Sequence, residues 1–180
     1  MASEHNPDHL IAIFNQCFLA THNTRLVRGG DEPVYLPAGP GRPQHELHFA
    51  HGFFRSALHE ISHWLIAGEA RRQLADFGYW YQPDGRDARQ QREFERVEVK
   101  PQALEWILCR AAGVPFQVSL DNLNGEATDA AGFKQAVRTQ VLDYLQQGLN
   151  QRAETLRLAL CRHYGTRPRL DPADFASDPR

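Results

Sequence analysis

The sequence predicts an α+β fold in which a small mixed sheet packs against several helices within a single domain. Two observations predict this class. Apolar residues recur with the period of a helix in segments spread along the chain, whereas the alternation typical of strands is confined to a few short stretches. A chain of 180 residues is also long enough for one domain with a sizeable core. We therefore expect one functional domain over residues 1–165 and a polar, proline-containing tail over 166–180.

The first 51 residues are predicted to supply one helix and most of the strands. A capping asparagine, a proline in the first turn and a following aspartate predict a helix over residues 6–21. Residues 21–27 and 45–51 are predicted to form strands. Residues 31–37 contain two prolines, which confine this segment to an edge strand or an extended loop.

A candidate metal-binding motif, A-L-H-E-I-S-H-W, lies in a predicted helix over residues 52–67. It contains His59, Glu60 and His63 in the pattern H-E-x-x-H. Residues four apart share one face of a helix, so both imidazoles can bind the same metal ion. Glu60 is offset by about 100° around the helix axis and can lie near the metal without binding it. Both histidines border the apolar stripe, which favours metal ligands over two structural histidines.

The third ligand of such a site is predicted to be a glutamate. A polar helix is expected over residues 87–97, and Pro101 suits the first turn of the next helix. Glu98 lies just before that helix, between two valines, and Glu105 lies inside it. We favour Glu98, because an acid flanked by valines is less easily explained as part of a solvated surface. Weaker alternatives are the three histidines of the third predicted strand, His45, His48 and His51.

Three consecutive aromatic residues follow a short helix predicted over residues 69–75. Adjacent residues of a strand point to opposite faces, so at least one of these aromatic side chains should line a surface or a cleft. An aromatic cover over the core is an equally simple explanation. The candidate substrate contacts in this region are Tyr79, Trp80, Tyr81 and Asp84.

The rest of the chain is predicted to close the domain. Residues 115–120 suggest a further strand, and helical periodicity predicts helices over residues 129–147 and 152–164. The tail from residue 166 is polar and rich in proline, and we expect it to be mobile.

Composition and charge exclude several classes of protein. The formal net charge of −2 argues against stable nucleic-acid binding through bulk electrostatics. No apolar run approaches the roughly 20 residues that a transmembrane helix needs, and the first residues lack the pattern of a secretory signal. The three cysteines are widely spaced, without a C-x-x-C pair. We therefore expect a cytoplasmic protein without a membrane partner.

Two histidines and a carboxylate can support two kinds of chemistry. A zinc ion would lower the pKa of a bound water, and Glu60 would act as the general base of a hydrolase, either a peptidase or a ribonuclease. An iron(II) ion with open positions would bind dioxygen and oxidise a substrate. The types of ligand do not separate zinc from iron, and the pattern by itself suggests the zinc hydrolase.

A series of motifs covers nearly the whole chain and resembles the bacterial elongation factor P hydroxylase family. The motifs begin with N-T-R-L at Asn23, D-E-P-V-Y-L-P-A at Asp31 and the H-E-x-x-H segment itself. They continue with D-F-G-Y-W-Y and P-D-G-R between residues 76 and 86, V-E-V-K-P-Q-A-L at Val97 and V-S-L-D-N-L at Val118.

This resemblance implies a specific function. The family hydroxylates the lysine of elongation factor P that already carries a β-lysyl group, and its fold is similar to that of a metal-binding α/β endoribonuclease. By motif, the ligands of a non-haem iron(II) site would be His59, His63 and Glu98, with dioxygen as the co-substrate. Glu105 remains a weaker alternative, and Glu60 becomes either a proton carrier or a neighbour of the ligands. The partner would be elongation factor P.

Overall fold

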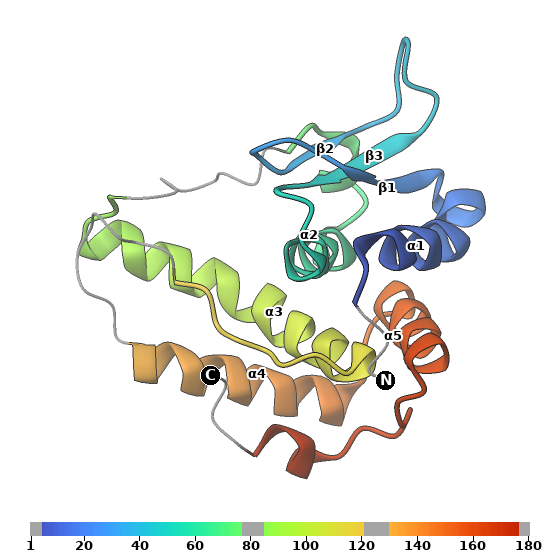
Figure 1. The fold of residues 1–180 in the computed structure, drawn as a ribbon. Helices are drawn as coiled ribbons and strands as arrows, with labels where there is room; N and C mark the ends of the chain where they lie inside the picture. The colour runs from blue at the N-terminus through green and yellow to red at the C-terminus, as the bar shows by residue number, and fades with distance from the viewer. Residues whose placement is uncertain (1–4, 77–84, 121–129, 177–180) are drawn as a thin grey trace.

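The computed structural model describes residues 5–76, 85–120 and 130–176 (Figure 1). These residues form five α-helices, three strands and two short 3-10 helices. In chain order, the elements are α1 (Pro7–His22), β1 (Thr24–Arg28), β2 (Val34–Leu36), β3 (His45–Phe49), α2 (Phe54–Ile66), η1 (Arg71–Gln73), α3 (Ala88–Ala112), α4 (Ala130–Gln147), α5 (Gln151–Tyr164) and η2 (Pro172–Phe175). The predicted α+β class is confirmed.

The sheet is small and mixed, with the strand order β1-β3-β2. The central strand β3 pairs in parallel with β1 and antiparallel with β2, so the proline-flanked β2 lies at an edge, as predicted. Leu26, Leu47 and Tyr35 are aligned across the three strands, and all three are buried. This row gives the sheet one apolar face toward the core.

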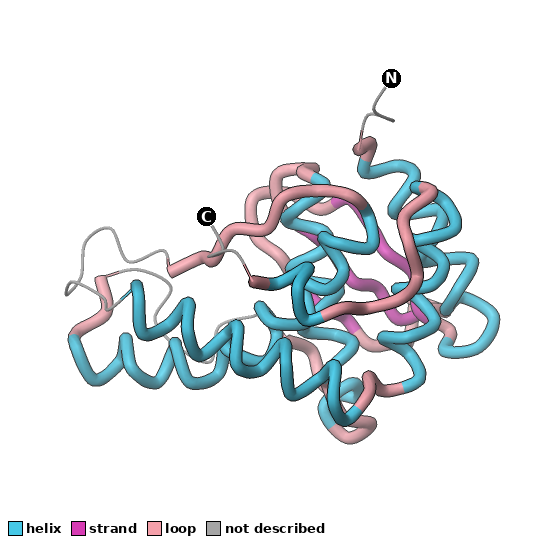
Figure 2. Tube along the Cα trace, turned by 90° about the horizontal axis from the view of Figure 1, so that it is seen from below, coloured by secondary structure: helices cyan, strands magenta, loops and turns pink. Residues whose placement is uncertain are grey.

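Helices α1 and α2 pack beside the sheet, and α3 lies on the other side of α2 (Figure 1). Aromatic side chains join the first two helices, because Phe14 and Phe18 of α1 meet the indole of Trp64 edge-on at 5.2 and 4.9 Å between ring centroids. Seen from below, α3 and α4 run together away from the strands (Figure 2). The core therefore continues from the sheet through α2 to the buried half of α3.

Helix α3 is longer than the sequence predicts. The two helices expected on either side of residues 98–100 form one continuous helix of 25 residues, with Pro101 inside it. A proline in a helix interior removes one backbone hydrogen bond and crowds the preceding turn. Here the residues from Pro101 to Cys109 are all buried, and their packing compensates for that loss. The helix ends at Gly113 in the left-handed conformation (φ 73°), as predicted.

Three other predictions are wrong in the described residues. The helix expected over residues 69–75 is a single 3-10 turn, because none of the residues in that turn is buried and Leu74 is 61% exposed. Residues 115–120 form no strand; Phe116 instead stacks on Trp106 with ring centroids 5.3 Å apart. The segment expected to be mobile from residue 166 packs on the domain through residue 176, with Phe175 fully buried.

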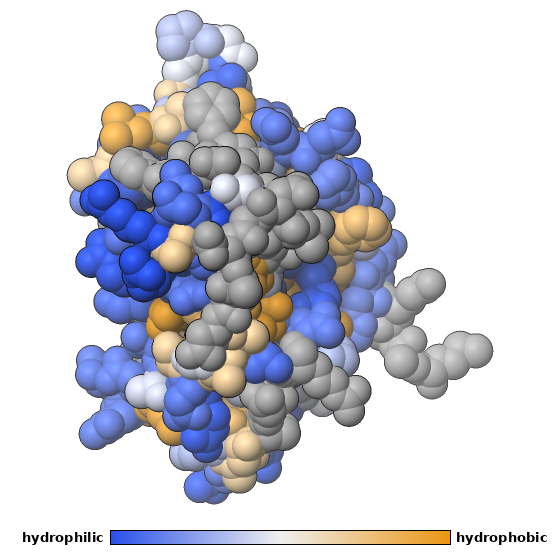
Figure 3. Space-filling view, turned by 90° about the vertical axis from the view of Figure 1, so that its left-hand side faces the viewer, coloured by the Kyte–Doolittle hydropathy of each residue, from blue (hydrophilic) through white to orange (hydrophobic). Residues whose placement is uncertain are grey.

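One face of the molecule carries both hydrophilic and apolar side chains (Figure 3). On the face shown in Figure 3, apolar side chains gather near the middle between hydrophilic ones. Among the described residues, no helix has both the length and the apolar character needed to span a membrane.

Candidate metal centre

Helix α2 positions both histidines of the H-E-x-x-H motif. Its apolar stripe, which includes Ala57, Leu58 and Ile61, is fully buried and fixes the rotation of the helix. His59 and His63 lie at the border of this stripe, with their ring centroids 4.9 Å apart. Their side chains are 25% and 37% exposed, so both remain accessible from outside the core.

Helix α3 adds a carboxylate to the two imidazoles. Glu98 Oε1 lies 2.9 Å from His63 Nε2, and Glu98 Oε2 lies 3.8 Å from His59 Nε2. One donor atom from each of the three residues lies within 4.8 Å of the others. The structure therefore brings together the three residues that the sequence favours, although Glu98 lies within α3 rather than before it. Burial alone would raise the pKa of Glu98, but His63, His59 and a bond from Gln102 hold it well below the usual range.

Glu105 does not lie where a third metal ligand would lie, because it contacts the other ring nitrogen of His59. Its Oε2 lies 2.9 Å from Nδ1 of His59, on the side of the imidazole opposite the Glu98 contact. With the proton on Nδ1 donated to Glu105, Nε2 keeps its lone pair and faces His63 and Glu98. Burial would lower the pKa of His59, but the adjacent Glu105 carboxylate raises it to about 10, so a metal ion that binds Nε2 would displace a proton from that nitrogen. Glu105 thus orients a candidate ligand.

A buried glutamine fixes the Glu98 carboxylate. The Gln102 side chain is fully buried, and its amide nitrogen donates to Glu98 Oε2 at 3.0 Å. The same amide nitrogen donates to the carbonyl of Ser119 at 2.8 Å, and the Gln102 amide oxygen accepts from the Ser119 N–H at 2.9 Å. Sequence reasoning missed Gln102. The signal available was its spacing, because Glu98 and Gln102 are one helical turn apart and Glu105 is nearly one further turn away.

These residues fit a metal ion by the chemistry of their donors. Two imidazole nitrogens and one carboxylate form the donor set of a facial site with open positions, which suits iron(II) and also zinc. The orienting contact on the far nitrogen of His59 is the arrangement that metal-bound histidines usually show. The buried position of Glu98 favours the same interpretation, since a buried carboxylate needs a positive partner.

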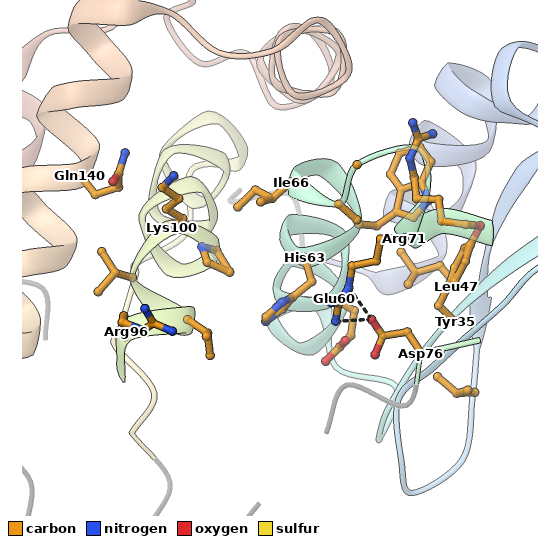
Figure 4. A pocket seen from close by; sticks show the side chains of 18 of the residues that line it. Tyr35, Leu47, Glu60, His63, Ile66, Arg71, Asp76, Arg96, Lys100 and Gln140 are labelled. Atoms are coloured by element: carbon orange, nitrogen blue, oxygen red, sulfur yellow. Dashed lines mark hydrogen bonds and ion pairs between the residues drawn. The ribbon is translucent and has the colours of Figure 1, made fainter. Parts of the chain in front are cut away.

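A cavity of about 900 Å³ adjoins this cluster. Its wall includes Glu60, His63 and Ile66 from α2, and Val97, Lys100 and Pro101 from α3. Figure 4 shows Glu60 and His63 side by side on α2, with Arg96 and Lys100 across the cavity on α3. Burial raises the pKa of Glu60. The exposed side of the candidate centre therefore faces a space large enough for a long side chain.

Comparison with known proteins identifies the family. The sequence matches the family model described as elongation factor P hydroxylase over residues 13–175. The chain belongs to the elongation factor P hydroxylase family. Among its relatives is the elongation factor P lysine hydroxylase of Haemophilus influenzae, which is 59% identical over 172 residues, covering 96% of this chain and 97% of that protein. The family resemblance inferred from the sequence motifs is confirmed.

The three predicted strand histidines lie elsewhere in this elongation factor P hydroxylase fold. His45 Nδ1 accepts the N–H of Ala38 at 2.9 Å, and His48 Nε2 lies 2.8 Å from Glu46. His51 follows β3 with a φ of 58°, and none of the three histidines belongs to the described metal cluster. The candidate substrate contacts Tyr79, Trp80, Tyr81 and Asp84 lie outside the described residues.

Proposed function

We propose that this protein is a non-haem iron hydroxylase that acts on the β-lysylated lysine of elongation factor P. The observation that carries the proposal is the His59–His63–Glu98 cluster, which borders a cavity in a chain of the elongation factor P hydroxylase family. The name of the Haemophilus influenzae relative, elongation factor P lysine hydroxylase, supports lysine hydroxylation as the reaction. A substrate that serves translation also supports the cytoplasmic location expected from the sequence.

Bound iron(II) would supply the activation of dioxygen that lets one oxygen atom enter a C–H bond of the substrate. The protein side chains hold the site ready for this chemistry. Glu105 keeps the proton of His59 on Nδ1, so that Nε2 is available, and Gln102 fixes the rotation of the Glu98 carboxylate. Apolar residues such as Ile66 and Val97 line the adjoining cavity and can contact the methylene groups of a long side chain.

The decisive experiment is hydroxylation of the proposed substrate. The protein is purified without oxygen, loaded with iron(II) and mixed in air with β-lysylated elongation factor P and a chemical reductant. Intact-mass analysis should show a gain of one oxygen atom, about 16 Da, that is lost in His63→Ala. The matched control is His9→Ala, since His9 is an exposed histidine of α1 outside the cluster and its removal should leave the mass gain intact.

A zinc hydrolase is the second candidate, favoured by the position of Glu60 beside His63 at the cavity. In that case Glu60 would accept a proton from a zinc-bound water. The same protein loaded with zinc would then cleave a peptide or an RNA, and Glu60→Gln would abolish cleavage while sparing the metal. Cleavage of this kind, without any gain of mass by elongation factor P, would replace the hydroxylase proposal.

A further inference from the structure

One carboxylate at the cavity, that of Glu60, has no ion-pair partner among the described residues, unlike the other two acidic side chains there. Among the described residues that line the cavity, three are acidic: Glu60, Asp76 and Glu93. Asp76 Oδ2 lies 2.9 Å from Arg71, and Glu93 Oε1 lies 2.7 Å from Arg96. Within the described residues, no hydrogen bond or ion pair reaches the Glu60 side chain, which is only partly exposed. A partly buried carboxylate without a cation is costly, so this position is suited to a positive ligand.

The charges of the proposed centre point in the same direction. Glu98 and Glu105 together carry two negative charges, which balance the two positive charges of a divalent ion. Glu60 follows His59 directly in the chain and adds one further negative charge at the cavity wall. No lysine or arginine of the described chain pairs with it. Glu60 therefore places one negative charge next to the proposed centre, in a cavity whose lining also includes Arg71, Arg72, Arg96 and Lys100.

The shape and the walls of the cavity restrict what that positive ligand can be. Its volume of about 900 Å³ suits an extended side chain, and apolar residues including Val34, Leu47, Ile66 and Val97 line much of it. A long aliphatic chain that ends in an ammonium group matches both features, because its methylene groups can contact the apolar wall while its charge meets a carboxylate. This is the chemistry of a lysine side chain.

We propose that Glu60 binds an ammonium group of the substrate lysine side chain and thereby determines the preference of the enzyme for a cationic side chain. This inference rests on the proposed function, since it takes elongation factor P as the substrate. It gives Glu60 a role in binding, which differs from that of a metal ligand and from that of a general base in hydrolysis. A hydrogen bond to a charged group is the expected source of the affinity.

The test is a binding measurement, made by calorimetry without oxygen so that no turnover occurs. The iron(II)-loaded protein is titrated with β-lysylated elongation factor P, and separately with elongation factor P whose target lysine is replaced by methionine. Glu60→Gln should weaken binding of the lysylated protein by about 10- to 100-fold and change binding of the methionine protein little. Glu60→Asp, which keeps the charge, should recover part of the lost affinity.

Glu69→Gln is the matched control. Glu69 is exposed, follows α2 and lies outside the cavity lining, so its variant loses the same charge without touching the proposed contact. We expect Glu69→Gln to bind the lysylated and the methionine forms of elongation factor P as tightly as the unsubstituted protein does. Metal content is measured in each sample, and Glu60→Gln should retain iron as fully as the control.

Three results would overturn the inference. Equal affinity of Glu60→Gln and the unsubstituted protein for the lysylated substrate would exclude the contact. An equal loss for the lysine and methionine substrates would show that Glu60 does not sense the charge. Loss of iron in Glu60→Gln would make Glu60 a ligand. Failure of the proposed function is distinct, because the unsubstituted protein would then neither bind nor hydroxylate elongation factor P.

Discussion

Helices α2 and α3 meet at the candidate metal centre but contribute to it in different ways. Helix α2 supplies His59 and His63, whose relative position follows from a spacing of four residues within one helix. Helix α3 supplies Glu98, Gln102 and Glu105, which reach the histidines only because the two helices pack together. The first contribution is local in the sequence, whereas the second depends on the tertiary fold.

The site residues of the two helices also differ in how far their side chains are exposed. The side chains of Glu98 and Glu105 are 1% and 6% exposed, whereas those of His59 and His63 are 25% and 37% exposed. The α3 residues therefore form the fixed inner side of the centre, and the α2 residues form its accessible side next to the cavity. The comparison teaches that the short motif forms the accessible side of the candidate centre, while the packed helix behind it sets the relative positions of the candidate ligands.

The largest effect should follow from removing the α3 carboxylate. Glu98→Ala leaves two imidazoles without the anionic ligand and leaves the buried Gln102 amide without one of its acceptors. We expect iron to be lost on dialysis and hydroxylation to fall below detection, with metal content measured by elemental analysis. Glu95→Ala on the same helix, outside the cluster, should keep both. Full retention of iron in Glu98→Ala would show that α3 supplies no metal ligand.

The sequence predicted the local part of this site better than the tertiary part. The H-E-x-x-H helix and α5 follow from periodicity, α1 follows from its capping residues, and the edge position of β2 follows from its flanking prolines. The flanking valines favoured Glu98 over Glu105 as the third ligand, but the sequence did not predict that both glutamates reach His59, because Pro101 indicated a helix start and separated the two residues. In the continuous helix α3 they are seven residues apart on one face, and each contacts His59 on a different ring nitrogen.

The other wrong predictions share a physical cause. Helix propensity suggested a helix over residues 69–75, but no apolar face is buried there to stabilise one. Residues 115–120 have the composition of a strand, yet Gln102 takes the backbone N–H and C=O of Ser119. In both segments tertiary contacts decided the outcome, and a single sequence does not encode these contacts in any local pattern.

An intermediate effect should follow from neutralising the orienting carboxylate. Glu105→Gln keeps the volume of the side chain but removes the charge that faces Nδ1 of His59. The imidazole should become a weaker donor through Nε2, and we expect iron affinity to fall by about 10- to 100-fold. Competition with a chelator measures this affinity, and circular dichroism checks that the fold is retained. An unchanged affinity would show that Glu105 stabilises α3 without tuning the ligand.

The smallest effect on the centre should come from weakening a hydrogen bond that holds the C-terminal end of α2. Asn150 caps α5 through the N–H of Ala153 at 2.9 Å and donates to the carbonyl of Leu65, in the last turn of α2, at 2.9 Å. Asn150→Ala should therefore lower the free energy of unfolding by about 1–2 kcal/mol, measured by urea denaturation. Iron affinity should stay unchanged, because α3 and the buried face of α2 still hold the ligands together. A parallel fall in iron affinity would mean that the geometry of the histidines depends on the end of α2, and that the accessible side of the centre is less independent than its burial suggests.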